Sequence, residues 1–231
     1  MVMSAARPGL ATSTSASGSV RSVPRRLGKI ARRVADTLED VVYPRATSAQ
    51  DQWQRVVMNR VVDRHLRSLE PEQRSAAEIS GDAHKDKPWR SFRSLNFPEF
   101  DLCAPLVDHA RYDVVICEQV LEHVVDPCAA ARNLRQLCVP GGHVVVTSPF
   151  LIKVHEDWGL EDYWRFTPRG LRTLLERSGL RVETVDHWGN RQCVYGNLAK
   201  WSAYRRWQPL GNRADTPVQV WAFARNPPVG G

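Results

Sequence analysis

The chain has 231 residues, of which 42% are hydrophobic and 25% charged, which is ordinary for a globular protein. This length suits one domain with an extension, and no apolar run approaches the roughly 20 residues of a membrane span. Of 32 basic residues, seven precede the first acidic residue, Asp36, which leaves 25 to balance 25 acidic ones. Such a balance gives no support for a basic nucleic-acid surface, so we expect no nucleic-acid partner.

The stretch 1–24 is rich in Ser, Thr, Ala and Gly and poor in large apolar side chains, which predicts a disordered basic tail. It has no apolar core of a secretory signal, although an organelle transit peptide has a similar composition. The five cysteines are odd in number and show no Cys-x-x-Cys spacing. We therefore expect reduced thiols in a cytoplasmic protein, with no disulfide framework and no metal site.

An N-terminal helical extension is expected over 25–75. Apolar residues recur at steps of three and four from Leu27 to Val41, which predicts an amphipathic helix with basic residues over its first turns. The pattern favours a helix packed on the body, and weak contact with an anionic membrane surface is the alternative. A second helix is expected over 50–69, where Pro71 stops it.

The body of the protein is expected over 76–226, followed by a short tail over 227–231. It opens with strands at 76–80 and 92–97 and a turn or short helix at 105–110. A strand–helix–strand unit follows, whose short apolar runs are typical of strands buried on both faces of a parallel sheet. Polar residues after such strands lie where α/β sheets bind ligands. The unit comprises a strand over 112–117, a helix over 127–138 and a strand over 143–148.

The last third of the chain is expected to add helices and two strands. Thr167 followed by Pro168 is a typical helix start, with threonine as N-cap, and Gly179 is typical of a helix end. The remaining elements are a strand over 181–186, a helical stretch over 191–207 and an alternating strand over 218–224.

Several blocks together resemble class I S-adenosylmethionine-dependent methyltransferases of the type 11 domain family. They are EISG from Glu78, YDVVICEQVLEHV from Tyr112 and VPGGHVVVTSPF from Val139. The later pieces HE at His155 and DYWRFT from Asp162 are similar to a bacterial subgroup of that family. The resemblance covers roughly 76–226.

The resemblance implies a Rossmann-like α/β fold. Its sheet would be mostly parallel and seven-stranded, with helices on both faces and an antiparallel last strand. Between Gly81 and Tyr112 there is room for one strand instead of two, so a reduced sheet is the alternative. The glycine-rich cofactor loop is replaced by SGDAH from Ser80, in which a turn can still supply backbone N–H donors if the Asp82 side chain points away. The Gly-x-Gly-x-x-Gly of nicotinamide enzymes is absent, which excludes that class.

The resemblance also implies that S-adenosylmethionine is the cofactor. Asn96 falls at the position that grips the ribose hydroxyls, and Asp101 is the candidate for the adenine amino group, although it could equally cap a turn. The residues expected to bind the cofactor are Glu78, Ser80, Gly81, Asn96, Asp101, Leu102, Glu118 and Gln119.

Methyl transfer to a hydroxyl is an in-line displacement that a base assists. His155 is the expected base, and Glu156 and Asp162 are expected to orient it or to bind the acceptor; a surface histidine and solvated carboxylates are the alternatives. His123 is expected to pack beneath the site. The residues expected to wall the acceptor pocket are Tyr163, Trp164, Arg165, Trp188 and Asn190. A plain core role is the alternative for the aromatic residues Tyr163 and Trp164, and Arg165 could simply pair with Asp162.

Together these inferences predict an S-adenosylmethionine-dependent methyltransferase that methylates oxygen in a small molecule or a glycan. The alternative is a methyltransferase-fold protein that has lost catalysis and serves as a binding or scaffold module. The missing glycines favour this alternative, whereas the retained Glu78, Glu118 and His155 argue against it.

Overall fold

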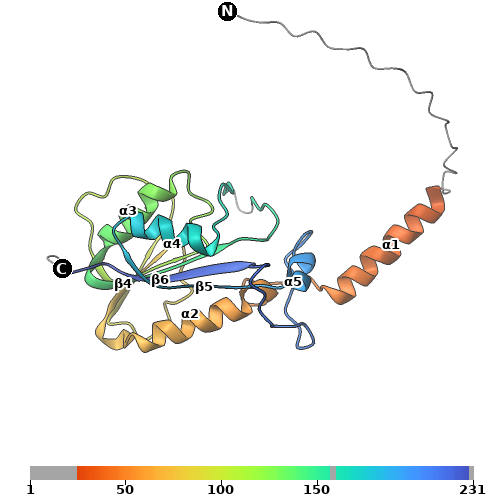
Figure 1. Ribbon diagram of the computed structural model, residues 1–231, viewed down its shortest axis with the longest axis horizontal. Coiled ribbons are helices and arrows are strands. Elements are labelled where there is room, and N and C mark those ends of the chain that lie inside the picture. Colours follow the sequence, from red (N-terminus) through yellow and green to blue (C-terminus); the bar gives the residue numbers. More distant parts are fainter. Residues whose placement is uncertain (1–24, 157–159, 229–231) are drawn as a thin grey trace, which may run out of the picture. The chain divides into compact units, whose positions relative to one another are not determined.

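The structure is a computed structural model that describes residues 25–156 and 160–228. The chain forms two units, the first ending at Val42 and the second beginning at Tyr43. One six-stranded sheet in the second unit has the order β2-β1-β3-β4-β6-β5 (Figure 1). The strands are β1 (Ser75–Ile79), β2 (Ser91–Leu95), β3 (Tyr112–Glu118), β4 (Cys138–Pro149), β5 (Arg181–Trp188) and β6 (Gln219–Arg225).

The direction of the strands confirms the expected fold class. All neighbours pair in parallel except β6, which is antiparallel to both β4 and β5 and lies between them. The described residues contain six strands instead of seven, so the reduced sheet is confirmed. The reason is the short chain between Gly81 and Tyr112, which holds β2 and then only turns and bends before β3.

Helices cover both faces of the sheet, and each face has its own hydrophobic core. Helices α3 (Pro127–Leu137) and α4 (Pro168–Arg177) lie on one face, and α2 (Val56–Ser68), preceded by the short helix η1 (Trp53–Arg55), lies on the other (Figure 1). Because both faces are covered, the apolar runs of β3 and β4 are buried throughout, as their sequences predicted.

Local sequence signals determine where two of these helices begin. Asp126 accepts hydrogen bonds from the backbone N–H groups of Cys128 and Ala129 at the start of α3. Thr167 accepts one from Gly170 at the start of α4. Each cap side chain accepts backbone N–H groups that have no partner within the helix, and the proline that follows has no N–H to satisfy.

The predicted helix over 191–207 is wrong beyond its first turns. Helix α5 (Arg191–Gly196) ends where the Asn197 side chain donates to the carbonyl of Cys193 at 2.8 Å. The chain then extends, and Ser202 and Ala203 form antiparallel bridges with Arg45 and Gln52. These distant backbone partners satisfy groups that a helix would have paired internally.

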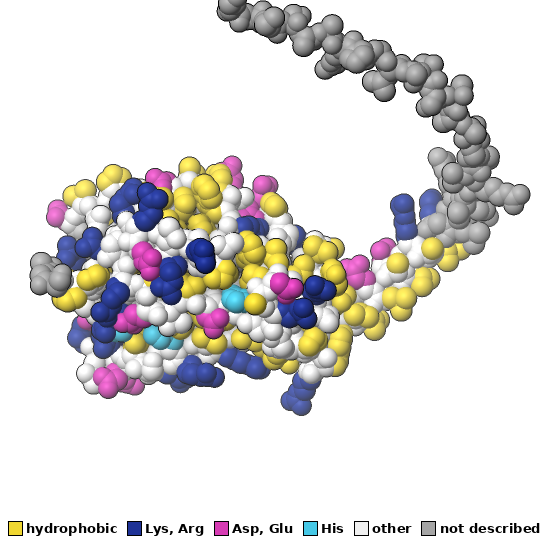
Figure 2. All heavy atoms as spheres, in the orientation of Figure 1, with side chains coloured by type: hydrophobic (Ala, Val, Ile, Leu, Met, Phe, Trp, Pro, Cys, Tyr) yellow, Lys and Arg dark blue, Asp and Glu magenta, His cyan; other side chains and the backbone are white. Residues whose placement is uncertain are grey.

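Helix α1 (Arg25–Val42) is amphipathic, as predicted. The side chains of Ile30, Val34, Leu38 and Val41 are exposed, and Figure 2 shows hydrophobic atoms along one side of α1. Its contact with an anionic membrane surface stays a prediction. Among the described residues, no helix is long and apolar enough to cross a membrane. The predicted tail over 1–24 lies outside the described residues.

Residues 43–75, expected to belong to the extension, are part of the second unit, where η1 and α2 pack on the sheet.

His143 in β4 provides a test of the core. Burial lowers the pKa of His143 to about 4, and the charges of Arg225 and Arg74 act in the same direction. An unfolded chain would bind the proton near pH 6.5, so this group should cost about 3 kcal/mol of stability as the pH falls from about 6.5 to about 4. We expect the free energy of unfolding, measured in urea, to be lower at about pH 4.5 than at about pH 7.5. This difference should be smaller in His143→Gln. An equal loss in the variant would contradict the assignment.

Candidate functional site

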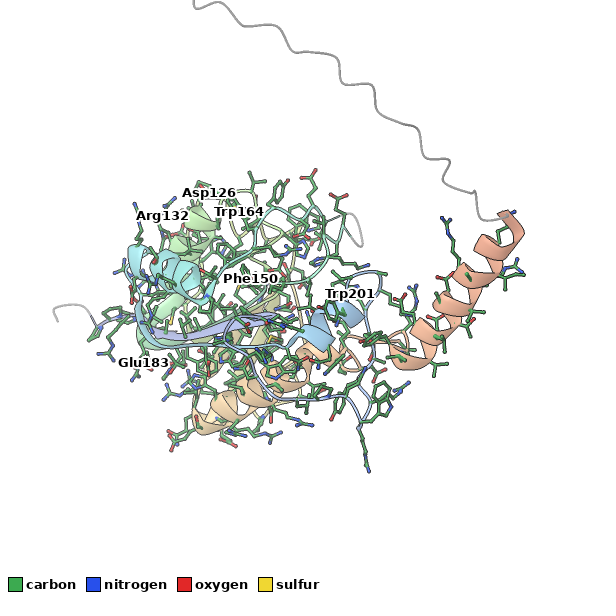
Figure 3. The ribbon with its side chains drawn as sticks, turned by 45° about the vertical axis from the view of Figure 1, so that its right-hand side comes forward. Asp126, Arg132, Phe150, Trp164, Glu183 and Trp201 are labelled. Atoms are coloured by element: carbon green, nitrogen blue, oxygen red, sulfur yellow. The ribbon has the colours of Figure 1, made fainter. Side chains whose placement is uncertain are left out.

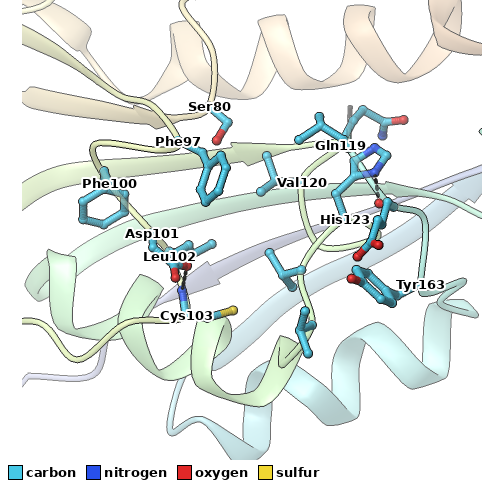
Figure 4. A pocket seen from close by; sticks show the side chains of 14 residues that line it. Ser80, Phe97, Phe100, Asp101, Leu102, Cys103, Gln119, Val120, His123 and Tyr163 are labelled. Atoms are coloured by element: carbon cyan, nitrogen blue, oxygen red, sulfur yellow. Dashed lines mark hydrogen bonds between the residues drawn. The ribbon is translucent and has the colours of Figure 1, made fainter. Parts of the chain in front are cut away.

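A cavity of about 470 Å³ lies where β1 and β3 end (Figure 4). Ser80 follows β1 and Gln119 follows β3, and both line this cavity. Further lining residues come from the loop after β2, from the segment leading into α3 and from the loop before α4. The cavity therefore occupies the edge of the sheet at which α/β proteins bind ligands.

The loop after β1 is closed by a buried carboxylate. Glu78 accepts hydrogen bonds from the backbone N–H groups of Ala83 at 3.1 Å and His84 at 3.0 Å. Burial raises the pKa of Glu78, although these hydrogen bonds act in the opposite direction. A Cβ atom on Gly81 would lie 2.8 Å from a Glu78 oxygen, so any larger residue here would displace this carboxylate. The glycine-poor loop thus keeps a compact turn through its carboxylate.

Ser80 and Asp82, in the same loop, also have conformations that suit this turn. Ser80 has a left-handed backbone with φ of 51°, a conformation that glycine adopts most easily. The Asp82 side chain is exposed and pairs with Lys85 at 2.7 Å, so it points away as the turn requires.

A second carboxylate, Glu118 at the end of β3, converges on the same loop. Its Oε1 atom lies 3.4 Å from Nε2 of His84. Burial lowers the pKa of His84, but the interaction with Glu118 and the charges of both glutamates outweigh it and raise the pKa overall. The side chains of Arg55 and Glu118 are close enough to interact electrostatically, so Arg55 brings a cation from η1. Glu78 and Glu118 are thus joined through His84.

Among the predicted ribose and adenine positions, two of three residues line the cavity. Asp101 and Leu102 are on its wall, beside Phe100. Asp101 Oδ1 accepts from the backbone N–H of Cys103 at 2.8 Å, so it also caps a turn. Asn96 is exposed after β2 and does not line the cavity; its side-chain oxygen accepts from Ser94 at 3.1 Å.

Gln119 is held at the cavity by a row of buried amides. Its backbone has a left-handed φ of 55°. Its side-chain Nε2 donates to Thr147 at 3.0 Å and to Gln219 at 2.9 Å, and Gln219 donates in turn to Gln54 at 3.1 Å. Four segments far apart in sequence thereby fix the turn after β3.

A cluster of titratable groups lies beside the cavity. The Glu122 side chain is fully buried, and burial raises its pKa to about 8. His123 lines the cavity, and the rings of His123 and His155 meet edge to face at 5.0 Å. His155 Nδ1 lies 3.1 Å from Oδ2 of Asp162. The sequence pointed to the association of His155 with Asp162, but it placed His123 beneath the site instead of on the wall.

The loop before α4 is fixed by hydrogen bonds on both sides. Asp162 accepts from the backbone N–H of His155 at 2.8 Å and from the guanidinium of Arg165 at 2.6 Å. Burial raises the pKa of Asp162, but these donors outweigh it, and the pKa lies below its usual value. Glu156 is exposed in the same loop.

Of the predicted acceptor-wall residues, Arg165 pairs with Asp162 and does not line the cavity, and the other four divide into two groups. Tyr163 lines the cavity, and Trp164, labelled in Figure 3, is exposed and donates through its indole N–H to the carbonyl of Val124. Trp188, the last residue of β5, and Asn190 are instead buried, and their donors bind carbonyls of residues 209–211. The structure therefore does not bring these two residues to the cavity.

The cavity mouth is apolar. Phe97, Val125, Leu160 and Tyr163 all line the cavity and are exposed, with 61% of Phe97 and 70% of Val125 accessible to solvent. Exposed apolar side chains that share one opening are typical of a binding surface for an apolar ligand.

Known families match this chain. A family model described as a methyltransferase domain matches residues 67–185, which is more than half of the chain. A ubiquinone biosynthesis O-methyltransferase from Alkalilimnicola ehrlichii is 44% identical over 132 residues, which cover 53% of this chain and 50% of that protein. Another from Proteus mirabilis is 56% identical over 34 residues, 15% of this chain and 14% of that protein. The chain thus spans about half the length of the first of these relatives, and less of the second.

Solved structures share the fold. An S-adenosylmethionine-dependent methyltransferase from Mesorhizobium loti has a TM-score of 0.50 at 16% identity, covering 70% of this chain and 96% of that chain. A 1,6-didemethyltoxoflavin-N1-methyltransferase from Burkholderia thailandensis, solved with S-adenosylhomocysteine, has a TM-score of 0.50 at 10% identity, covering 91% and 93%. At these identities the likeness concerns the architecture of the sheet and its helices.

Proposed function

The chain belongs to the class I S-adenosylmethionine-dependent methyltransferases, and on that premise we propose that it methylates a hydroxyl oxygen of a small molecule. One observation supports this most: the carboxylate-closed loop after β1 and the histidine cluster beside β4 meet at one cavity. A donor site and a proton-accepting site are thereby adjacent.

The residues around the cavity fit the cofactor. When bound, S-adenosylmethionine supplies an electrophilic methyl carbon on a positively charged sulfur. Glu78 and Glu118 are close in sequence to the cavity-lining Ser80 and Gln119. Their negative charges favour a cation there, although Arg55 and His84 offset part of them. Asp101 offers an acceptor for an exocyclic amino group, and Phe100 and Leu102 offer an apolar wall for a flat ring.

We place removal of the acceptor proton at the cluster formed by Glu122, His123 and His155. His155 is the base expected from the sequence; Asp162 accepts from its backbone N–H, and the carboxylate lies 3.1 Å from its Nδ1 atom. Burial lowers the pKa of His155, although the charge of Asp162 opposes this, so the ring is neutral near pH 7 and can accept a proton.

The apolar mouth of the cavity favours an aromatic or otherwise apolar acceptor over a glycan. Tyr163 and Phe97 present ring surfaces there. The relative from Alkalilimnicola ehrlichii, named as an O-methyltransferase of ubiquinone biosynthesis, supports oxygen as the methylated atom.

A methyl-transfer assay tests this proposal. The full chain is incubated with methyl-labelled S-adenosylmethionine and with matched sets of phenols, sugars and amines. We expect label on the phenols and not on the amines or sugars. Cofactor binding without transfer to any set would instead favour the scaffold alternative.

A further inference from the structure

The cluster beside the cavity has the composition of a metal site. Glu122, His123 and His155 each place a ligand atom within 4.8 Å of those of the other two. The Glu122 side chain is fully buried, and its Oε1 atom has no hydrogen-bond partner among the described residues. A buried carboxylate oxygen without a donor is costly unless another positive group satisfies it.

Each histidine has an oxygen acceptor near its Nδ1 atom, and His123 is oriented as metal ligands usually are. Nδ1 of His123 lies 2.7 Å from the carbonyl of Glu161, which can only accept, so this nitrogen carries the proton. Its Nε2 is then unprotonated and lies 3.9 Å from Oε1 of Glu122. Nδ1 of His155 lies 3.1 Å from Oδ2 of Asp162, a contact without hydrogen-bond geometry. The carbonyl behind His123 fixes the tautomer of that imidazole and raises its basicity toward a cation.

We propose that Glu122, His123 and His155 bind one divalent first-row cation beside the cavity. Two imidazoles and one carboxylate suit zinc, cobalt or manganese better than the all-oxygen sites of magnesium or calcium. Metal–ligand bonds of about 2.0–2.2 Å require small rotations that draw the three side chains together. His123 lines the cavity, so a cation held by these residues would lie at the cavity wall.

The role of the cation in methyl transfer rests on the proposed function, whereas the metal site itself does not. A cation held by these residues would lower the pKa of an acceptor hydroxyl bound to it, and the hydroxyl would release its proton to water. With the cation bound, His155 would act as a ligand, and the cation would take over the activation that we assign to the free imidazole in its absence. Cation binding itself requires neither cofactor nor acceptor.

A titration with the cation alone tests the site. The full chain, without a histidine tag and stripped of metal with EDTA, is titrated with Co²⁺ and followed by its visible absorption, and with Zn²⁺ by calorimetry. We expect one cation per chain. Glu122→Gln and His155→Gln should each weaken binding at least tenfold, by about 1.4 kcal/mol or more. Glu122→Gln conserves shape, and thermal melting verifies that each variant is folded.

His187→Gln is the matched control, because His187 lies on β5 outside the cluster and should leave binding unchanged. No Co²⁺ spectrum, or equal affinity in the wild type and both cluster variants, would overturn the site. Methyl transfer that proceeds at full rate with EDTA would overturn its proposed consequence. Failure of the methyl-transfer assay leaves the titration unaffected, so the two failures are distinguishable.

Discussion

Replacing Glu78 by alanine is expected to weaken the binding of S-adenosylhomocysteine at least tenfold and to lower the free energy of unfolding by roughly 2–4 kcal/mol. The variant removes the acceptor of two backbone N–H groups, those of Ala83 and His84. It also removes a nearby negative charge from His84, which is paired with Glu118. The loop that closes the donor end of the cavity therefore loses its fixed shape. Calorimetric titration and urea unfolding measure the two effects.

Two further variants separate this loop role from a general charge effect. Glu78→Gln keeps one acceptor oxygen, so its affinity should fall between those of the wild type and the alanine variant. Glu72→Ala removes an exposed carboxylate before β1 and should change neither quantity. Wild-type affinity in Glu78→Ala would show that the loop does not contact the cofactor.

Replacing His155 by alanine is expected to reduce turnover by about 10²–10³-fold while the Kd for S-adenosylhomocysteine changes by less than about twofold. His155 adjoins the cavity through His123 and is held by Asp162, but it does not line the region of Asp101 and Leu102. The loss should therefore fall on the chemical step and spare cofactor binding.

Single-turnover rates and calorimetry on the same preparation separate the two quantities. His187→Ala is the control histidine and should retain wild-type turnover. If cofactor affinity and thermal stability collapse together in His155→Ala, the residue supports the structure and its catalytic assignment is wrong.

The sequence predicted those parts of the fold that depend on local signals. The apolar run of β3 and the caps at Asp126 and Thr167 each act within a few residues, and the structure has strands and helices there. The end of α5 depends on bridges between Ser202 and the distant Arg45, which no local pattern contains. Contacts with distant residues therefore determine where α5 ends, and this is why the helix predicted over 191–207 was wrong.

In the candidate site, too, the sequence predicted what local patterns determine and missed what depends on distant contacts. Glu78 and Glu118 could be assigned to one cleft because parallel strands end at one edge of a sheet. His123 could not be placed on the cavity wall, because its orientation depends on the carbonyl of Glu161. Arg55 reaches the site from η1 only because η1 and α2 pack on the far face of the sheet.

The most direct test of the account is a crystal structure of the full chain with S-adenosylhomocysteine. We predict the adenine ring against Leu102 and Phe100, its amino group within hydrogen-bonding distance of Asp101, and the sulfur facing the side of His123. A ligand bound elsewhere, or a cavity filled by the protein's own side chains at millimolar ligand, would contradict the assignment of this cleft to the methyl donor.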